Sequence, residues 1–447
     1  MSEGKEKQGL ARHIGLAALV VYGIGDMVGA GIYGTIGVAA GKMGNAVWLS
    51  FLISMAAAMF TGLSYACLSS RYPRAAGAAY VSQRAFNWTF LSYLVGLAVA
   101  CSGLTSMAAG SRVFATNLSP LIGGTPIWMI FLGFIAILTA INLRGIRECV
   151  WVNVVCTTVE VGGLLFILGV SIPYFGSVNY LEVPPNVGTI TFPLLMTGAV
   201  LTFYAFVGFE DLLNLSEEVK DPQRTMPWGI LLAVSITAVL YVLVSIAAVS
   251  VVPYGQLADA SKGAPFAQIT MVTSPWMPPI TFTAITLFAV ANTALMNFIM
   301  GSRLVYGMSK QGLLPTWLGG VHASRRTPHR AILVLAGIVA VLAFVGDVSD
   351  LASATSLLLL LVFGLMNAAL IVLKLKRSEE KGHFEVPIFV PVIGLVICTA
   401  LVVTRLASAA SAGWTAPVIA LALLAGITVL YFVMRPRVEE QPNAAED

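Results

Sequence analysis

Residues 22–33 read Tyr22–Gly23–Ile24–Gly25–Asp26–Met27–Val28–Gly29–Ala30–Gly31–Ile32–Tyr33, so that glycines and one acid interrupt the first long apolar run of the chain. Residues 203–210, Phe203–Tyr204–Ala205–Phe206–Val207–Gly208–Phe209–Glu210, interrupt a later apolar run about 180 residues further on. Irregular backbone within a bilayer is tolerated only where it is buried in protein or lines a cavity, because lipid cannot hydrogen-bond it. Paired interruptions in two halves of a chain indicate the binding site of a secondary transporter.

The composition is that of a membrane protein. Of 447 residues, 58% are hydrophobic and 10% are charged, whereas a soluble domain carries about 25% charge. Twelve apolar segments are long enough to cross a bilayer of about 30 Å: 14–41, 46–70, 88–114, 126–143, 149–174, 191–218, 228–252, 278–309, 331–346, 351–374, 386–407 and 414–434. The first is too long and too rich in glycine for a signal peptide, so we expect it to be retained. We predict an all-α polytopic membrane protein.

The positions of lysine and arginine predict the orientation. With both termini in the cytoplasm, most of the 25 basic residues fall in cytoplasmic loops, as the positive-inside rule requires. Only Lys42, Lys262 and Arg405 are left at outer ends or loops, and Arg112 and Arg303 lie near helix ends. The cations are spread over separate short loops, so the net charge of +4 indicates no nucleic-acid partner.

The chain reads as one membrane domain with an internal repeat. The two interruptions lie five segments apart, and an odd offset gives the five-helix units 14–174 and 191–374 opposite orientations in the membrane. Residues 386–434 form two further helices that we expect to be peripheral. The polar stretch 71–87 suits a short cytoplasmic surface or re-entrant helix, and we expect 435–447 to be a disordered cytoplasmic tail.

The interruptions themselves suggest the substrate class. Unwound backbone exposes N–H groups at one half-helix and carbonyl groups at the other, and these attract a carboxylate and an ammonium group. A zwitterionic amino acid fits both. Glycines can instead serve close helix packing, but four of them surround one acid here. The spacing G-x-G-x-x-x-G inside an apolar run is not a dinucleotide fingerprint, and the chain has no ATP-binding P-loop motif.

Acids within apolar segments are few and point to function. They are Asp26, Glu160 and Glu210, with Asp211 beside the last, and each costs roughly 2.5–3.5 kcal/mol to insert. Asp26 binds substrate or caps a half-helix, and Glu210 gates the site, caps the later interruption or pairs with a cation. Glu160 lies in an apolar run with no nearby base. It carries a proton, binds a cation, or is an inert hydrogen-bonded acid.

The remaining reactive residues indicate no cofactor, metal site or enzyme chemistry. The five cysteines lie in or beside apolar segments and predict no disulfide framework. The four histidines lie outside the segment interiors, which argues against a metal site or a histidine proton relay. No nucleophile elbow or H-E-x-x-H motif is present, so we expect no enzymatic activity.

Four motifs resemble those of the amino acid–polyamine–organocation (APC) superfamily of transporters. They are Gly29–Ala30–Gly31–Ile32–Tyr33, the segment Pro73–Tyr80, Phe206–Val207–Gly208–Phe209–Glu210 with its continuation Glu217–Arg224, and Asn297–Met308 with Gly312–Pro315. The second departs from the superfamily pattern at Ala78, where a glycine is usual. The four follow the superfamily order over nearly the whole chain.

The resemblance implies a five-plus-five inverted repeat with the first and sixth helices unwound around a central substrate. By motif position, backbone N–H groups at Gly29, Ala30 and Gly31 would receive the substrate carboxylate, and carbonyls near Met27, Phe206 and Val207 the amine. The same alignment places Asp26, Gly208 and Asn297 in the substrate site, and makes Tyr204 an aromatic gate and Glu210 a gating glutamate. The connection Asn117–Thr125 has no cysteine, so no disulfide-linked heavy-chain partner is indicated.

Two departures bear on mechanism. Glu160 stands where proton-coupled relatives often carry a lysine, and Asp26 stands where neutral residues are common. Two acids near the cavity favour a cationic substrate. We therefore expect a secondary transporter of amino acids or related amines in the cytoplasmic membrane, with Glu160 and Asp26 serving proton coupling. Sodium coupling, exchange of polyamines or organic cations, a channel, and a protein that binds without transporting are the alternatives.

Overall fold

The computed structural model describes residues 12–74, 77–185, 187–259, 264–278, 280–345, 348–376, 379, 381–409 and 414–436. These residues contain no strand, and a single isolated bridge joins Ile14 to Val219. The predicted tail 435–447 lies mostly outside the described residues, as do Ala75 and Ala76 of the second motif.

Helices make up the fold. The α-helices are α1 (Leu16–Val28), α2 (Ala30–Met43), α3 (Val47–Arg71), α4 (Gly77–Phe86), α5 (Thr89–Leu118), α6 (Ile127–Arg144), α7 (Ile146–Ser171), α8 (Phe192–Phe203), α9 (Pro222–Val251), α10 (Tyr254–Leu257), α11 (Pro265–Thr273), α12 (Ile280–Lys310), α13 (His329–Val345), α14 (Val348–Leu375), α15 (Phe389–Ala407) and α17 (Thr415–Met434). Within the part of the chain that is described, nine helical stretches are long and apolar enough to cross a membrane, and three apolar helices are shorter.

This architecture confirms the all-α polytopic fold class. Each of the twelve predicted ranges holds a helix or an interrupted pair of helices. The five-plus-five inverted repeat and the unit boundaries stay predictions. Large apolar side chains are exposed along the outside of the bundle, among them Ile137, Trp151, Leu165 and Val239. Such a surface is far more apolar than that of a soluble monomer, and it fits lipid contact.

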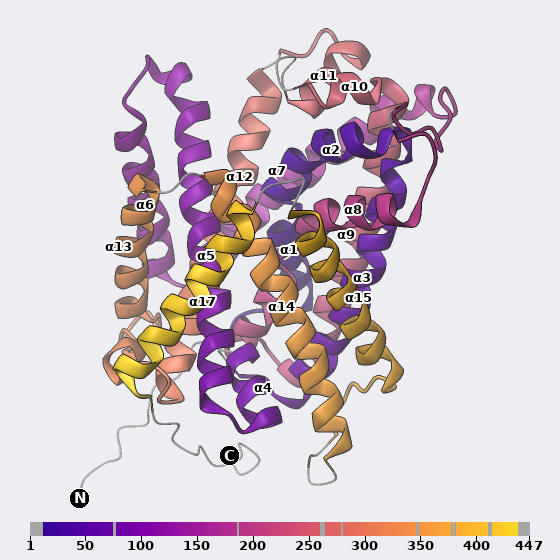
Figure 1. Cartoon of the computed structure of the whole chain (residues 1–447). Helices are drawn as coiled ribbons and strands as arrows, with labels where there is room; N and C mark the ends of the chain where they lie inside the picture. The colour runs from indigo at the N-terminus through magenta and orange to yellow at the C-terminus, as the bar shows by residue number, and fades with distance from the viewer. Residues whose placement is uncertain are drawn as a thin grey trace, which may run out of the picture.

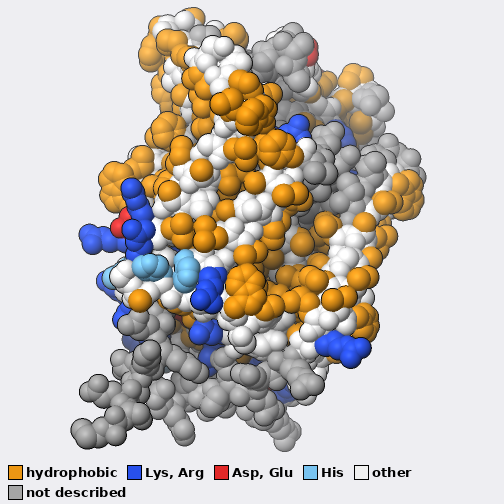
Figure 2. Space-filling model, turned by 90° about the vertical axis from the view of Figure 1, so that its left-hand side faces the viewer, with side chains coloured by type: hydrophobic (Ala, Val, Ile, Leu, Met, Phe, Trp, Pro, Cys, Tyr) orange, Lys and Arg blue, Asp and Glu red, His pale blue; other side chains and the backbone are white. Residues whose placement is uncertain are grey.

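The two ends of the bundle differ in charge. Figure 1 shows α4 at one end and α10 and α11 at the other, and we name these the α4 face and the α10 face. Lysine and arginine gather toward the α4 face, whereas the upper part of the same surface is mostly apolar (Figure 2). The short helix α4 lies where the polar stretch 71–87 predicted a surface helix.

Both predicted interruptions are breaks in helical structure. At the first, α1 ends at Val28 and α2 begins at Ala30, with Gly29 between them at φ −53° and ψ −140°. At the second, α8 ends at Phe203 and is followed by a short 3₁₀ turn, η4 (Tyr204–Phe206). Gly208 then takes φ +131° before a longer 3₁₀ segment, η5 (Asp211–Glu218).

The two breaks pack directly against each other. A Cβ on Gly31 would lie 2.9 Å from the Cα of Ala205, and a Cβ on Gly208 would lie 3.0 Å from the carbonyl carbon of Asp26. Real Cβ atoms essentially never come closer than 3.0 Å to other atoms, and a contact of 3.0 Å is tighter than nine in ten of those that occur. At Gly208 the left-handed φ disfavours any other residue as well. These two glycines therefore allow the backbones of the breaks to meet in the middle of the bundle.

A buried ion pair fixes the end of the second break near the α4 face. The Arg303 side chain is fully buried, and its Nε lies 3.1 Å from the Glu218 carboxylate. Its guanidinium also donates to Asn142 at 2.6 Å. Lys220 N–H donates to the Ile14 carbonyl at 2.9 Å, which ties η5 to the start of α1. Arg303 was predicted near a helix end, and burial with Glu218 gives it a structural role.

A second ionic cluster lies on the α4 face. Glu385 accepts from Arg71 Nε at 2.6 Å, from Lys374 Nζ at 2.5 Å and from Gly382 N–H at 3.1 Å. The carboxyl is partly desolvated, which raises its pKa, but the bonds from Arg71 and Lys374 outweigh this and lower the pKa of Glu385 to about 2. The cluster joins α3 and α14 to the segment before α15.

We predict that Glu385→Gln lowers the melting temperature of the purified protein by several degrees near pH 7. Because the folded-state pKa of Glu385 is depressed, its contribution is complete above about pH 4.5 and disappears as the pH falls toward 2. The difference in melting temperature between the wild type and Glu385→Gln should therefore shrink as the pH falls from about 4.5 toward 2. The control is Glu148→Gln, which removes an exposed carboxylate. Equal melting temperatures of wild type and Glu385→Gln at pH 7 would contradict this role.

Candidate functional site

A small buried cavity lies where the two breaks meet. Its free space is about 40 Å³, and it lies between α1, α2, α5, α12, α14 and the segment from η4 to η5. The lining residues are Asp26, Met27, Gly31, Val99, Ser102, Ser106, Tyr204, Val207, Gly208, Glu210, Asp211, Thr293, Asn297, Met300 and Leu359. We name it the acidic cavity, because three of these residues are acids and none is a lysine, arginine or histidine.

The three carboxyl groups are buried and differ in their partners. The exposed fractions of Asp26, Glu210 and Asp211 are 5%, 4% and 3%. Glu210 Oε2 accepts from Gly208 N–H at 2.8 Å, so part of this carboxylate serves the break itself. Asp26 Oδ2 and Asp211 Oδ1 are buried and have no hydrogen-bond partner among the described residues. The carboxyl groups of Asp26 and Asp211 lie close to each other.

Hydroxyl and amide groups complete the polar lining. Asn297 Nδ2 donates to Ser106 Oγ at 3.4 Å and to the Thr293 carbonyl at 2.8 Å, which joins α5 to α12 across the cavity. Ser102 adds another hydroxyl from α5. The cavity thus offers acceptors of both full and partial negative charge. It fits a ligand that donates several hydrogen bonds.

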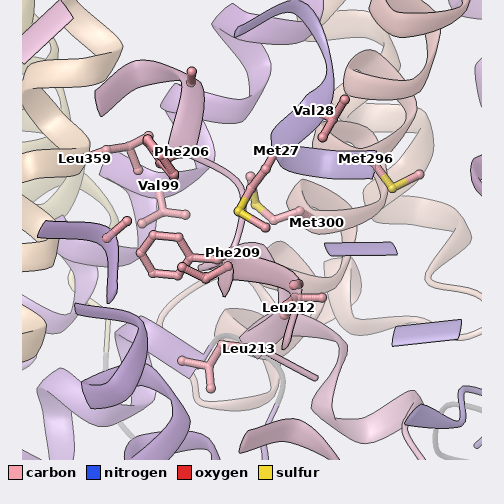
Figure 3. Close-up of a cluster of buried hydrophobic side chains, with 14 of the residues drawn as sticks. Met27, Val28, Val99, Phe206, Phe209, Leu212, Leu213, Met296, Met300 and Leu359 are labelled. Atoms are coloured by element: carbon pink, nitrogen blue, oxygen red, sulfur yellow. The ribbon is translucent and has the colours of Figure 1, made fainter. Parts of the chain in front are cut away.

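Apolar side chains close the cavity on its other sides. In Figure 3 the thioethers of Met27 and Met300 lie close together, and Val99 and Leu359 approach from the other side of the break. Methionine is unbranched and adapts readily to different shapes. Because 40 Å³ holds only a few water molecules, the cavity must widen to admit an amino acid.

Tyr204 forms the wall of the cavity toward the α10 face. It follows α8 directly and lines both the acidic cavity and a second, larger cavity of about 260 Å³. Tyr204 therefore lies between two spaces, and its role as an aromatic gate stays a prediction.

Two predicted site residues, Phe206 and Gly29, are not among the residues that line the cavity. The Phe206 ring is fully buried and packs on Tyr241 with ring centroids 5.1 Å apart, and a Cβ on Gly29 would meet the Thr293 hydroxyl. The contacts of their backbone groups with substrate stay predictions. The side chain of Ala30 lies outside the described residues. The Met27 carbonyl already accepts from the Tyr241 hydroxyl at 2.6 Å, which leaves it one further lone pair.

Glu160 lies apart from the cavity, in the middle of α7. It is fully buried, and neither carboxylate oxygen has a hydrogen-bond partner in the described part of the chain. Tyr33 donates to its backbone carbonyl at 2.9 Å. An amide of α12, Asn292, lies beside its side chain. A carboxylate cannot stay charged in such surroundings without a cation.

Beside Glu160 a polar network joins α1, α7 and α12. Asn292 Nδ2 donates to the Gly25 carbonyl at 3.2 Å and to Thr157 Oγ1 at 3.2 Å. Asn153 Nδ2 donates to Asn292 Oδ1 at 3.0 Å, while its own Oδ1 has no partner among the described residues. The network therefore holds the end of α1 near Asp26 against the helix that carries Glu160.

The geometry bears on the capping alternatives. Asp26 lies within the last turn of α1, and Gly29, the N-cap residue of α2, has no side chain that could cap that helix. The substrate-binding and capping roles of Asp26 both stay predictions. Glu210 does stabilise the later break, through Gly208 N–H, but no cation pairs with it in the described structure. Glu210 therefore has a structural role at the break, and its gating role stays a prediction.

Sequence reasoning missed several lining residues. Asp211 was noticed only as a neighbour of Glu210, although two consecutive acids in an apolar segment are a signal, since a regular helix would separate them by about 100°. The hydroxyls of Ser102, Ser106 and Thr293 carry no such signal. Serine and threonine within membrane helices commonly bond to their own helix, and only tertiary structure shows which of them face a cavity.

The comparisons with known proteins fit this architecture. A family model described as amino acid permease matches residues 14–434. An uncharacterised transporter of Mycobacterium tuberculosis strain H37Rv is 30% identical over 90% of this chain and 88% of its own length. The methylthioribose transporter of Bacillus subtilis is 30% identical over 89% of this chain and 88% of its own length. The chloroplastic cationic amino acid transporter 9 of Arabidopsis thaliana is 30% identical over 70% of this chain and 58% of its own length.

Broken helices around a buried polar cavity, with these relatives, define a membrane transporter and not an enzyme. The chain belongs to the amino acid permease family. This confirms the resemblance to the APC superfamily that the four motifs indicated.

We predict that Gly208→Ala destabilises the protein, because φ +131° is strained for alanine and the new methyl group would press on Asp26. The backbone strain alone costs about 1–3 kcal/mol. The matched control is Gly162→Ala on α7, where a Cβ meets no atom within 4 Å. Thermal unfolding and size-exclusion profiles of both variants in detergent provide the measurement. A melting temperature of Gly208→Ala equal to that of Gly162→Ala would show that the second break tolerates a side chain.

Proposed function

We propose that this protein is a secondary transporter that moves cationic amino acids or related amines across the cytoplasmic membrane by alternating access. The observation that carries the proposal is the acidic cavity, where three buried carboxyl groups meet no cation among the lining residues. Buried carboxylates need a partner of opposite charge. A cationic substrate supplies it. The name of the Arabidopsis relative, a cationic amino acid transporter, supports the same class.

The two ends of an amino acid fit two different groups of the site. The N-terminus of α2 begins at the first break without a side-chain cap, so its N–H groups at Gly29, Ala30 and Gly31 are available for a carboxylate. Asp26 and Asp211 have unpartnered oxygens for ammonium groups. Carbonyls at Met27 and Val207 add acceptors beside them.

Alternating access needs a site that opens to each face in turn. The acidic cavity is small, and Tyr204 stands between it and the space toward the α10 face. The ion pair of Arg303 with Glu218 closes the other direction. We propose that the α4 face, toward which lysine and arginine gather in Figure 2, lies in the cytoplasm together with both termini.

Glu160 is our candidate for proton coupling. Its buried carboxyl group has no cation to balance a charge, so it suits a group that gains and loses a proton as the site opens and closes. Its network reaches the end of α1 through Asn292 and Gly25. Protonation could therefore alter the helix that carries Asp26.

Sodium coupling is the second candidate. Glu160 and Asn153 both hold oxygens without a partner, next to Thr157 and the Gly25 carbonyl. Oxygen donors of this kind also suit a small cation. Exchange of polyamines or organic cations, and substrate binding without transport, stay open for the same site.

We predict that Asp26→Asn and Asp211→Asn each raise the KM for cationic substrates by about 10- to 100-fold, the effect of losing a hydrogen bond to a charged group worth about 1.5–3 kcal/mol. Uptake of arginine, lysine, neutral amino acids and methylthioribose into proteoliposomes measures the selectivity. Glu210→Gln should have a smaller effect, because its amide oxygen still accepts from Gly208 N–H. An equal loss for neutral and cationic substrates would remove the two aspartates from amine recognition.

We also predict that Glu160→Gln abolishes uptake driven by a pH gradient while weaker exchange survives, because the amide cannot carry a proton. Glu148→Gln, an exposed position on the same helix, is the control and should leave uptake unchanged. The measurement compares proton-gradient, sodium-gradient and counterflow uptake in the same proteoliposomes. Undiminished proton-driven uptake by Glu160→Gln would take Glu160 out of the coupling role, and loss of sodium-driven uptake would favour the second candidate.

A further inference from the structure

A second cavity, of about 260 Å³, lies on the other side of Tyr204. Its walls come from α2, α8, α14 and α15. Two of its lining residues, Lys42 and Arg405, are cationic, and none is acidic. We name it the Lys42–Arg405 cavity. Its volume approaches the roughly 300 Å³ at which ligand pockets begin.

The Lys42–Arg405 cavity lies toward the α10 face. Arg405 stands in the last turn of α15, which starts beside the Glu385 cluster of the α4 face and runs for 19 residues, or about 28 Å. Lys42 stands in the last turn of α2, and the C-terminal part of this helix packs against α10. A molecule that enters from the α10 face therefore meets these two cations before it reaches Tyr204.

Neither cation has an acidic partner among the described residues. No described residue forms an ion pair or side-chain hydrogen bond with Lys42 or Arg405, in contrast to Arg71, Arg84 and Lys374 on the α4 face. Each complements the dipole of the helix that it ends. The interaction with the helix dipole explains why each helix ends in a cation. It does not explain why both cations line the same cavity.

The two cations are the lining groups that suit an anion. Thr35, Thr197 and Ser408 also line the cavity, but the hydroxyl group of each donates to a backbone carbonyl of its own helix. Lysine and arginine side chains around one concave space make charge-assisted hydrogen bonds to a carboxylate. A bound anion would also relieve the repulsion between the two cations.

We propose that the Lys42–Arg405 cavity binds the carboxylate of an incoming amino acid before its cationic groups pass Tyr204 into the acidic cavity. This inference rests on the proposed function and narrows it. A cationic amino acid complements the two cavities in turn. A polyamine without a carboxylate would be repelled by the first cavity, so we infer a preference for amino acids over their decarboxylated amines.

The test compares arginine with agmatine, its decarboxylated counterpart, in proteoliposomes of phosphatidylcholine only. In the double variant Lys42→Gln/Arg405→Gln, the KM for arginine should rise about 3- to 10-fold with little change in maximal rate, while the KM for agmatine stays constant or falls. The arginine effect should weaken as the ionic strength rises, because salt screens exposed charges. Arg325→Gln, an exposed position near the α4 face, is the charge control.

Equal changes for arginine and agmatine, or no change for either, would overturn the inference. If wild type transports neither compound, the proposed function fails, and binding of acetate tests the cavity separately. Acetate should raise the melting temperature of the wild type above that in chloride at equal ionic strength, as a ligand of the folded state does. The double variant should lose this shift. A shift produced by phosphatidylglycerol but not by acetate would assign the cavity to a lipid headgroup and refute a carboxylate site.

Discussion

Backbone that leaves the helical hydrogen-bond pattern within a bilayer must find its partners inside the protein, and this constraint organises the structure. Nearby side chains meet part of that need, and the two breaks are buried against each other. Gly31 brings the first break against Ala205 of the second, and Gly208 brings the second against Asp26 of the first. The Tyr241 hydroxyl donates to the Met27 carbonyl, and Glu210 accepts from Gly208 N–H. The cavity exists because the two breaks are held face to face.

The charged side chains also differ in whether they have partners inside the protein. Arg303 and Glu385 sit in ion pairs that hold elements together near the α4 face. The acids of the breaks have no such partner, and neither do the two cations beyond Tyr204, among the residues described. Paired charges therefore mark the scaffold of this transporter, while unpaired ones mark the path that we propose for its substrate.

Much of this could be predicted from the sequence, since glycines and single acids stand out sharply against an apolar background. That contrast located both breaks. It also singled out Asp26, Tyr204 and Glu210, which line one cavity in the structure. Motif position does not say which way a side chain points from irregular backbone, so it did not show that the Phe206 ring packs on Tyr241. The sequence could not predict that the serines of α5 line the cavity. The direction in which their side chains point depends on the rotation of α5 relative to α12, which no local sequence pattern encodes.

The unpartnered acids of the first cavity also have an electrical consequence. A carrier that returns empty must take its binding site back through the membrane potential, and each elementary charge that crosses 100 mV involves about 2.3 kcal/mol. A bound cation cancels part of the negative charge of the acidic cavity. Unloaded, it is negative unless its carboxyl groups hold protons. The voltage dependence of such a cycle would therefore fall on the return of the empty carrier, and Asp26 and Asp211 would set its size.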